Sequence, residues 1–247
     1  MLKTLQRLLS RKPEQPHAGA LQAWAQEHGY SFLNVRSASG CVIEGKQGAL
    51  DWRIEWGQSQ RSYIPGFELR LIADLQLPKE LMAIVLNRAL MESMERAVYE
   101  QYVDNLQTRI DTDTPPEMRW LVMHTKATGP ELGNLRDGFG GACSAHGWLS
   151  QWVASPLRPA LLNWVRRSAP DETLVLTIGR GRVTLRTGLP TADPERVALS
   201  FGVFEHAIRE AQRLGAEWKQ AANSGLTTLP SAWAHSAISQ PQVETAK

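Results

Sequence analysis

The sequence predicts an α+β fold of two sheet-plus-helix units, in each of which an antiparallel meander is covered by helices. Apolar and polar residues alternate through residues 50–56 and 67–75, which is the pattern of a strand with one buried face. Four such segments follow one another with short turns between them, as in an antiparallel meander. Longer segments with apolar residues at helical spacing flank them and can cover the buried face.

Length and composition are those of an ordinary globular protein. The 247 residues suffice for one large domain or two of roughly 100 residues, with 43% hydrophobic and 21% charged residues. A net charge of +2 gives no reason to expect nucleic acid as a partner. Two cysteines cannot form a disulfide framework and suit a reducing compartment. Without a membrane-spanning apolar run or a secretory signal, we expect a cytoplasmic protein.

Residues 1–16 are a basic amphipathic segment and a linker. Leucines form one edge of residues 1–12, with lysine and arginine around them, and prolines follow. One interpretation is a helix that touches a partner or a membrane surface. The other is a frayed terminal helix of the same domain, which is favoured because isolated helices of this length are marginal in water.

The first unit, residues 17–104, is predicted to contain a helix, four strands and a second helix. Residues 18–28 have helical spacing and are followed by glycine, a common helix end. Pro78 suits the first turn of the second helix, which is predicted to reach Tyr102. Residues 81–86 are apolar on all sides and are expected to be a buried part of that helix. The four predicted strands are residues 30–36, 41–45, 50–56 and 67–75.

The second unit, residues 115–220, follows a polar connector over residues 105–114 and is rich in predicted helices. Alternating segments on both sides of a Gly-Arg-Gly turn predict one hairpin. Residues 221–247 are dominated by serine, threonine, proline and glutamine and are expected to be a mobile tail. The predicted helices begin at 115, 148, 157 and 194, and the hairpin strands are 173–178 and 182–187.

Short matches between the two halves indicate an internal duplication as one interpretation. Residues 68–70 precede Pro78 by the same spacing at which residues 184–186 precede Pro194. Two unrelated α+β segments with the same helix-start chemistry explain these matches equally well.

Residues 138–147 are a glycine-rich stretch with one pair of candidate reactive residues. A Cys143 thiolate beside His146 could act as a nucleophile pair. A flexible connector with a small buried cysteine is the favoured interpretation. Cys41 and His124 would complete a set of zinc-ligand types, but zinc sites use close ligand pairs and only one is present. The stretch also lacks the context of a phosphate-binding loop, so we expect no metal ion and no cofactor.

The candidate binding residues are arginines and tryptophans on the predicted sheets. Arginines alternate with carboxylates on the outer face of the first sheet and recur on the second hairpin. Cross-strand pairing and a solvated hairpin are the simpler interpretations of these charges. Tryptophan often anchors binding interfaces, and the chain contains nine. The candidates are Trp52, Trp56, Arg53, Arg61, Arg70, Arg180, Arg182 and Arg186.

The favoured function is a non-enzymatic protein-interaction module, chaperone-like or adaptor-like, with an unidentified protein partner. No catalytic constellation stands out, and the order helix, meander, helix resembles in outline the modules of bacterial secretion chaperones. One alternative is an enzyme that uses Cys143 and His146, for which selective alkylation would be the sign. The other is a peripheral membrane protein held at the inner membrane face by residues 1–12. Exposed tryptophans would favour the interaction module.

Overall fold

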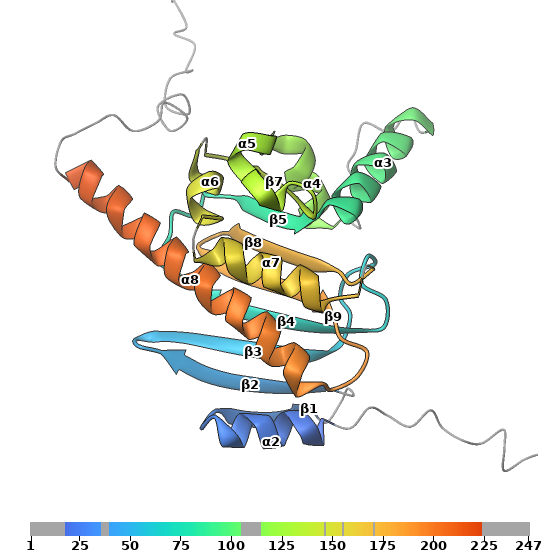
Figure 1. Ribbon diagram of the computed structural model, residues 1–247, viewed down its shortest axis with the longest axis vertical. Helices are drawn as coiled ribbons and strands as arrows, with labels where there is room; N and C mark the ends of the chain where they lie inside the picture. The colour runs from blue at the N-terminus through green and yellow to red at the C-terminus, as the bar shows by residue number, and fades with distance from the viewer. Residues whose placement is uncertain are drawn as a thin grey trace, which may run out of the picture.

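The computed structural model describes residues 18–35, 40–104, 115–145, 147–154, 156–169 and 171–223. In these residues nine strands form one antiparallel sheet in the order β1-β2-β3-β4-β9-β8-β5-β7-β6 (Figure 1). The first four strands are β1 (Ser31–Val35), β2 (Gly40–Gln47), β3 (Leu50–Gln58) and β4 (Phe67–Asp74). The other five are β5 (Ala83–Asn87), β6 (Thr125–Lys126), β7 (Phe139–Cys143), β8 (Leu174–Gly179) and β9 (Arg182–Gly188).

The predicted antiparallel meander is confirmed for β1 to β4. Neighbouring strands pair in chain order, so that Ile54 of β3 lies opposite Ile43 on one side and Leu71 on the other. All three side chains are at most 1% exposed. The period-2 pattern of the sequence therefore located both the strands and the face that they bury.

Two groups of helices lie on opposite faces of the sheet (Figure 1). The larger group packs on what we call the covered face, in a core that contains Leu71, Leu185 and Phe204. The smaller group packs on the other face, with Ile84 of β5 and Met91. The larger group is α2 (Gly19–Glu27), α6 (Trp148–Trp152), α7 (Leu157–Arg167) and α8 (Pro194–Asn223). The smaller group is α3 (Arg88–Asp104) and α4 (Pro116–Met123).

The structure corrects the expectation of two separate sheet-plus-helix units. Strands of both halves join a single sheet, because β4 pairs with β9 and places Leu71 opposite Leu185. Moreover, β5 of the first half lies between β8 and β7 of the second half. The connector over residues 105–114 lies outside the described residues. The internal duplication stays a prediction.

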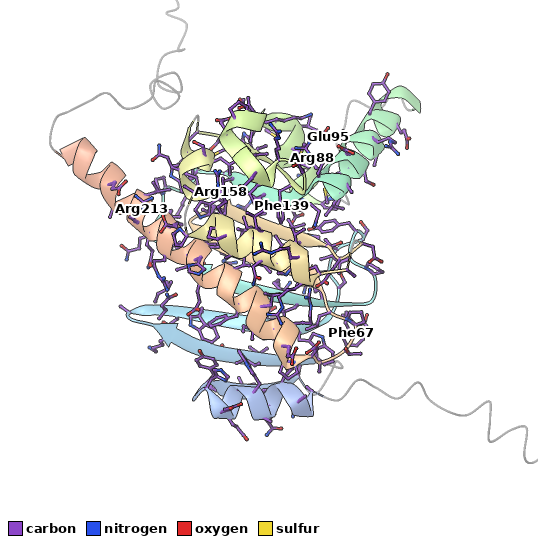
Figure 2. All side chains as sticks on the ribbon, viewed as in Figure 1. Phe67, Arg88, Glu95, Phe139, Arg158 and Arg213 are labelled. Carbon is purple, nitrogen blue, oxygen red and sulfur yellow. The ribbon has the colours of Figure 1, made fainter. Side chains whose placement is uncertain are left out.

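The prediction of a long helix that starts at Pro78 is wrong for the first part of that segment. Ala83–Asn87 form β5, and α3 begins only at Arg88. β5 lies between β8 and β7 and is buried on both faces, so its residues do not alternate between apolar and polar. A short apolar run of this kind fits a strand or a helix equally. Arg88 then ties the start of α3 to β7, since its guanidinium donates to the carbonyl oxygen of Phe139 at 3.2 Å (Figure 2).

The glycine-rich stretch is also not a flexible connector, because residues 139–143 form the buried strand β7. A Cβ atom at Gly141 would lie 2.6 Å from the carbonyl oxygen of Ile84, and one at Gly140 would lie 2.3 Å from the sulfur of Met91. At Gly141 the close group is backbone, so glycine is required there, whereas at Gly140 the Met91 side chain would have to move. A short helix, α5 (Gly129–Leu132), and a 3₁₀ turn precede this strand.

The remaining predicted helices agree with the structure. α4, α6 and α7 lie at the predicted positions, and α8 begins at Pro194 as expected. The Asp193 carboxylate accepts hydrogen bonds from the backbone N–H groups of Glu195 and Arg196, at 2.9 and 3.5 Å. Predictions for residues 1–16 lie outside the described residues, as does nearly all of the predicted tail.

The other face of β1, β2, β3, β4 and β9 is what we call the open face. Of the described helices, α2 and α8 pack closely on β1 and β4, and both lie on the covered face. Glu44, Arg53 and Asp74 point outward from the open face and are exposed. α4 reaches the open face at Arg186 of β9 through Glu117, whereas the end that carries Glu44, Arg53 and Asp74 is exposed and built on rigid strands.

Candidate functional site

A shallow hollow of about 760 Å³ lies on the open face, where β2 ends and β3 begins. Five strands contribute to it, because the outward positions of β1, β2, β3, β4 and β9 meet there. The charged residues that line it are Glu44, Lys46, Asp51, Arg53, Asp74 and Arg182. It thus presents cations and carboxylates in equal number.

Two ion pairs in the hollow are weak enough to exchange partners. Lys46 Nζ lies 3.1 Å from Asp51 Oδ1, and Arg182 Nε lies 2.7 Å from Asp74 Oδ1. These side chains are between 48% and 76% exposed. Exposed pairs contribute less than about 1 kcal/mol, so a charged partner could replace either interaction at little cost.

A chain of ion pairs leads from the hollow towards the interior. Arg53 Nε lies 2.9 Å from Glu55, and Arg70 contacts the same carboxylate. Arg70 also lies 3.6 Å from Glu68. Burial, together with repulsion from Arg186 and Arg53, lowers the pKa of Arg70 to about 10. This guanidinium is therefore partly shielded from water and lies among other cations.

The inner end of the chain is buried. Arg186 Nη1 lies 2.7 Å from Glu68 and its Nε lies 3.8 Å from Glu117, while Arg61 Nε donates to both Glu117 oxygens at 3.0 and 3.1 Å. Glu68, Glu117 and Arg186 are 3%, 4% and 8% exposed. Burial lowers the pKa of Arg61, but the charge and hydrogen bond of Glu117 together with Tyr63 outweigh burial, and the net shift of the pKa is upward. These pairs fasten α4 to the sheet.

The loop between β3 and β4 covers this buried end. A backbone hydrogen bond of 2.8 Å from Ser59 N–H to the carbonyl oxygen of Gly66 closes the loop, and Ile64 is 1% exposed. Tyr63 packs against the smaller hydrophobic cluster. Burial and the nearby charge of Glu117 raise the pKa of the Tyr63 hydroxyl. The loop thus excludes water from the inner ion pairs.

The six predicted arginines occupy different environments. Arg182 lines the hollow, whereas Arg180 is an exposed turn residue with φ 55° between β8 and β9. The four that belong to the chain of ion pairs are Arg53, Arg61, Arg70 and Arg186. Arg70 and Arg186 pair across strands, with Glu55 and Glu68, whereas Arg53 pairs within β3 and the loop residue Arg61 pairs with Glu117 of α4. Binding to a partner stays a prediction for all of them.

The predicted tryptophan anchors are core residues. Trp52 is 4% exposed and packs against Phe201 of α8 with ring centroids 4.6 Å apart. Trp56 is 2% exposed and its indole N–H donates to the carbonyl oxygen of Leu189 at 2.8 Å. Trp24, Trp148, Trp152 and Trp164 are buried as well, and Trp120 is half-buried. Tryptophan therefore gives no support to the interaction module.

Cys143 is the last residue of β7 and is 7% exposed. Burial raises the pKa of its thiol to about 11, although backbone N–H groups, including that of Ala145 at 3.4 Å, partly oppose the shift. The thiol is therefore protonated at neutral pH and is a poor nucleophile. His146 lies outside the described residues, so the pairing of the two side chains stays a prediction.

Cys41, Cys143 and His124, three of the four residues considered as zinc ligands, lie in separate parts of the structure. Cys41 lies in β2 and Cys143 in β7, with five strands between them, or about 29 Å at the usual strand spacing. His124 follows α4, where its backbone N–H donates to the carbonyl oxygen of Trp120. Among the described residues no group of three or more histidine, cysteine, aspartate or glutamate side chains could hold a metal ion.

Several residues of this surface were missed by sequence reasoning. Glu44, Lys46 and Asp74 line the hollow, and the alternation of β2 and β4 could have placed them on the outer face. Glu117 had no such signal, because it comes from a helix of the other half of the chain and reaches the sheet only in the fold. No helix in the described parts of the chain is long and apolar enough to cross a membrane.

Comparison with known proteins gives little that bears on function. No protein-family model and no curated protein matches the chain. A solved structure, that of the mycobacterial trehalose monomycolate transport factor A, TtfA, is similar to 83% of this chain and 94% of its own, with 6% sequence identity and a TM-score of 0.40. A likeness at this level says nothing about what the present chain binds.

Proposed function

We propose that the protein is a non-enzymatic interaction module that binds a partner protein through the open face. The observation that supports this is a broad hollow of both charge signs on the open face, whose lining contains no residue of a described helix. Rigid strands fix the positions of the charged groups, while the weak ion pairs between them leave those groups available.

The chemistry of the hollow favours a protein partner over nucleic acid. Lys46, Arg53 and Arg182 are balanced by three carboxylates, so the surface has no excess of the positive charge that a phosphate backbone requires. A protein segment with its own mixture of charges would be complementary. We place the protein in the cytoplasm, since Cys41 and Cys143 are both free and buried.

A pull-down with charge-reversed variants tests the proposal. The full chain is used as bait in a cell extract. It is compared with the Arg182→Glu variant, which replaces a positive charge of the hollow by a negative charge. The matched control is Arg209→Glu, at an exposed position of α8. We expect one protein to be recovered near stoichiometric yield by the full chain and the control, and to be lost with Arg182→Glu. Equal recovery by both variants would exclude the open face.

An enzyme that uses Cys143 and His146 is the first alternative. It requires a reactive thiolate, so Cys143 should be alkylated by iodoacetamide at neutral pH in the native chain. The buried, protonated thiol predicts the opposite, namely modification only after unfolding in urea. Peptide mass spectrometry distinguishes the two results.

Membrane association through residues 1–12 is the second alternative. These residues lie outside the described part of the chain, and their sequence alone supports the idea. Sedimentation with anionic lipid vesicles, comparing the full chain with one that lacks residues 1–12, tests it. Binding that is lost on deletion would support this anchor, and binding that survives would contradict it.

A further inference from the structure

The strand β1 leaves one edge of the sheet open. In the described residues β1 pairs with β2 alone and ends the strand order, whereas the opposite edge is the two-residue strand β6. An edge strand presents a row of backbone N–H and carbonyl groups that can pair with another strand. With five residues, β1 is long enough to do so.

Two of the usual features that prevent pairing are missing from this edge. Proteins protect edge strands with charged residues or proline, and β1 contains neither. Leu33 is 57% exposed and Val35 is 37% exposed, and both point to the open face beside β2, with Leu33 opposite Val42. Apolar side chains thus lie along an unpaired backbone edge.

The scarcity of charge extends to the helix beside this strand. Residues 18–35 contain one charged side chain, Glu27, in a chain that is 21% charged. The helix α2 packs against β1 at the same end of the molecule (Figure 1). Its exposed residues are mostly neutral, so few charges would lose water in an interface. The exposed residues of α2 are Gly19, Ala20, Gln22, Ala23, Gln26 and Glu27.

We propose that two copies of this chain associate edge to edge through β1, in antiparallel orientation about a two-fold axis. Such an axis places residues 31–35 against residues 35–31 of the second copy, with Leu33 next to its own counterpart. The neutral strand meets no like charge in this arrangement, and strand addition supplies main-chain hydrogen bonds. Two-fold pairs of identical subunits are the commonest assemblies.

The arrangement has a consequence for the open faces. A two-fold axis perpendicular to the sheet joins the two sheets into one and places both open faces on the same side. The association is independent of what the open face binds. Because a five-residue strand and one short helix bury little area, the dimer is expected to be weak and to depend on concentration.

Sedimentation velocity of the full chain over a wide concentration range tests the proposal. We expect a reversible shift from monomer to dimer. Leu33→Lys places two like charges opposite each other and should raise the apparent dissociation constant about tenfold or more. The matched control is Val122→Lys on α4, because Val122 is 52% exposed and far along the strand order from β1. A full chain that is monomeric throughout, or an unaffected Leu33→Lys variant, would overturn the proposal.

A cysteine substitution tests the register. Two cysteines opposite each other in antiparallel strands lie within the Cα distance that a disulfide spans, so Leu33→Cys should oxidise readily to a covalent dimer. Val122→Cys should stay monomeric under the same conditions. Failure of Leu33→Cys to cross-link contradicts the pairing. If the chain formed a dimer only after residues 1–17 were removed, the proposal would be wrong for the full chain, because residues 1–17 would be covering the β1 edge.

Discussion

The inner ion pairs depend on the side chain of Glu68. It is buried, contacts Arg186 at 2.7 Å and Arg70 at 3.6 Å, and accepts a hydrogen bond from Ser59. Glu68→Gln removes the charge that Arg186 and Arg70 share, and leaves the buried Arg186 with Glu117 at 3.8 Å and Arg70 with Glu55. We expect the free energy of unfolding in urea to fall by about 3–5 kcal/mol.

A matched control lies on the same face of the sheet. Asp51→Asn removes a carboxylate from the exposed pair with Lys46, and should change the free energy of unfolding by less than about 1 kcal/mol. If both variants were destabilised equally, the inner ion pairs would not be shielded from water as the structure indicates.

Cys143 leads to a prediction at alkaline pH. Burial raises the pKa of its thiol from 9.0 to about 11, so between these values the unfolded chain has lost a proton that the folded chain retains. Stability therefore falls as pH rises through this window, by up to about 1.4 kcal/mol per pH unit from this thiol. Urea unfolding should show a shallower decline for Cys143→Ala than for the native chain above pH 9, and parallel profiles at lower pH. Parallel profiles throughout would contradict the raised pKa.

Sequence reasoning found the charged residues of the sheet but not their surroundings. Alternation alone placed Arg53 and Arg70 on the outer face, and the structure agrees. It did not indicate that Arg186 is buried, because the cover comes from Glu117 and from the loop after β3. The exposure of a side chain also depends on segments that are distant in the sequence, and a local sequence pattern holds no information about them.

At the scale of elements, the errors fall on two strands that are buried on both faces, near the β6 edge of the sheet. Both β5 and β7 lie between two other strands and were predicted as helix and as connector. Strands with one solvated face alternate and were found, whereas strands buried on both faces lose that pattern. The glycines of β7 added to the difficulty, since glycine usually indicates a turn.

The close packing of β7 leads to a prediction for Gly141. A methyl group there would lie 2.6 Å from a backbone oxygen of β5, which cannot move without disturbing the sheet. Gly141→Ala is therefore expected to lower the free energy of unfolding by about 1–3 kcal/mol or more, as overpacking does.

The control for this change is Gly202→Ala in α8. Apart from the adjoining backbone of α8 itself, no atom lies within 4 Å of a Cβ at that position, and alanine favours a helix over glycine by up to about 1 kcal/mol. Gly202→Ala should thus be neutral or stabilising in the same thermal or urea experiment. Similar losses in both variants would argue against a specific close contact at Gly141.

At the scale of the whole molecule, the fold class was predicted but the strand order was not. Composition and local pattern indicate an antiparallel sheet with helices, and this is what the structure contains. The pairing of β4 with β9 joins residues more than a hundred positions apart, and nothing in a local pattern specifies such a contact. The two halves therefore looked like separate units.

The interleaved strands predict that neither half folds alone. Residues 1–110 would leave β5 without β8 and β7, and β4 without β9. We expect this fragment to give no cooperative unfolding transition by circular dichroism, and to regain native ellipticity when expressed together with residues 111–247. Independent cooperative unfolding of either fragment would contradict the single-sheet core.

The pairing of β4 with β9 also has a consequence for biosynthesis. β4 ends at Asp74 and β9 begins at Arg182, so at usual rates of translation a ribosome needs roughly 5–20 s to make the intervening chain. During that time the nascent chain has β4 with a free edge and with Leu69 and Leu71 not yet covered by α8. Codons that slow translation after residue 74 should therefore lower the soluble yield, and a ribosome-associated chaperone should restore it.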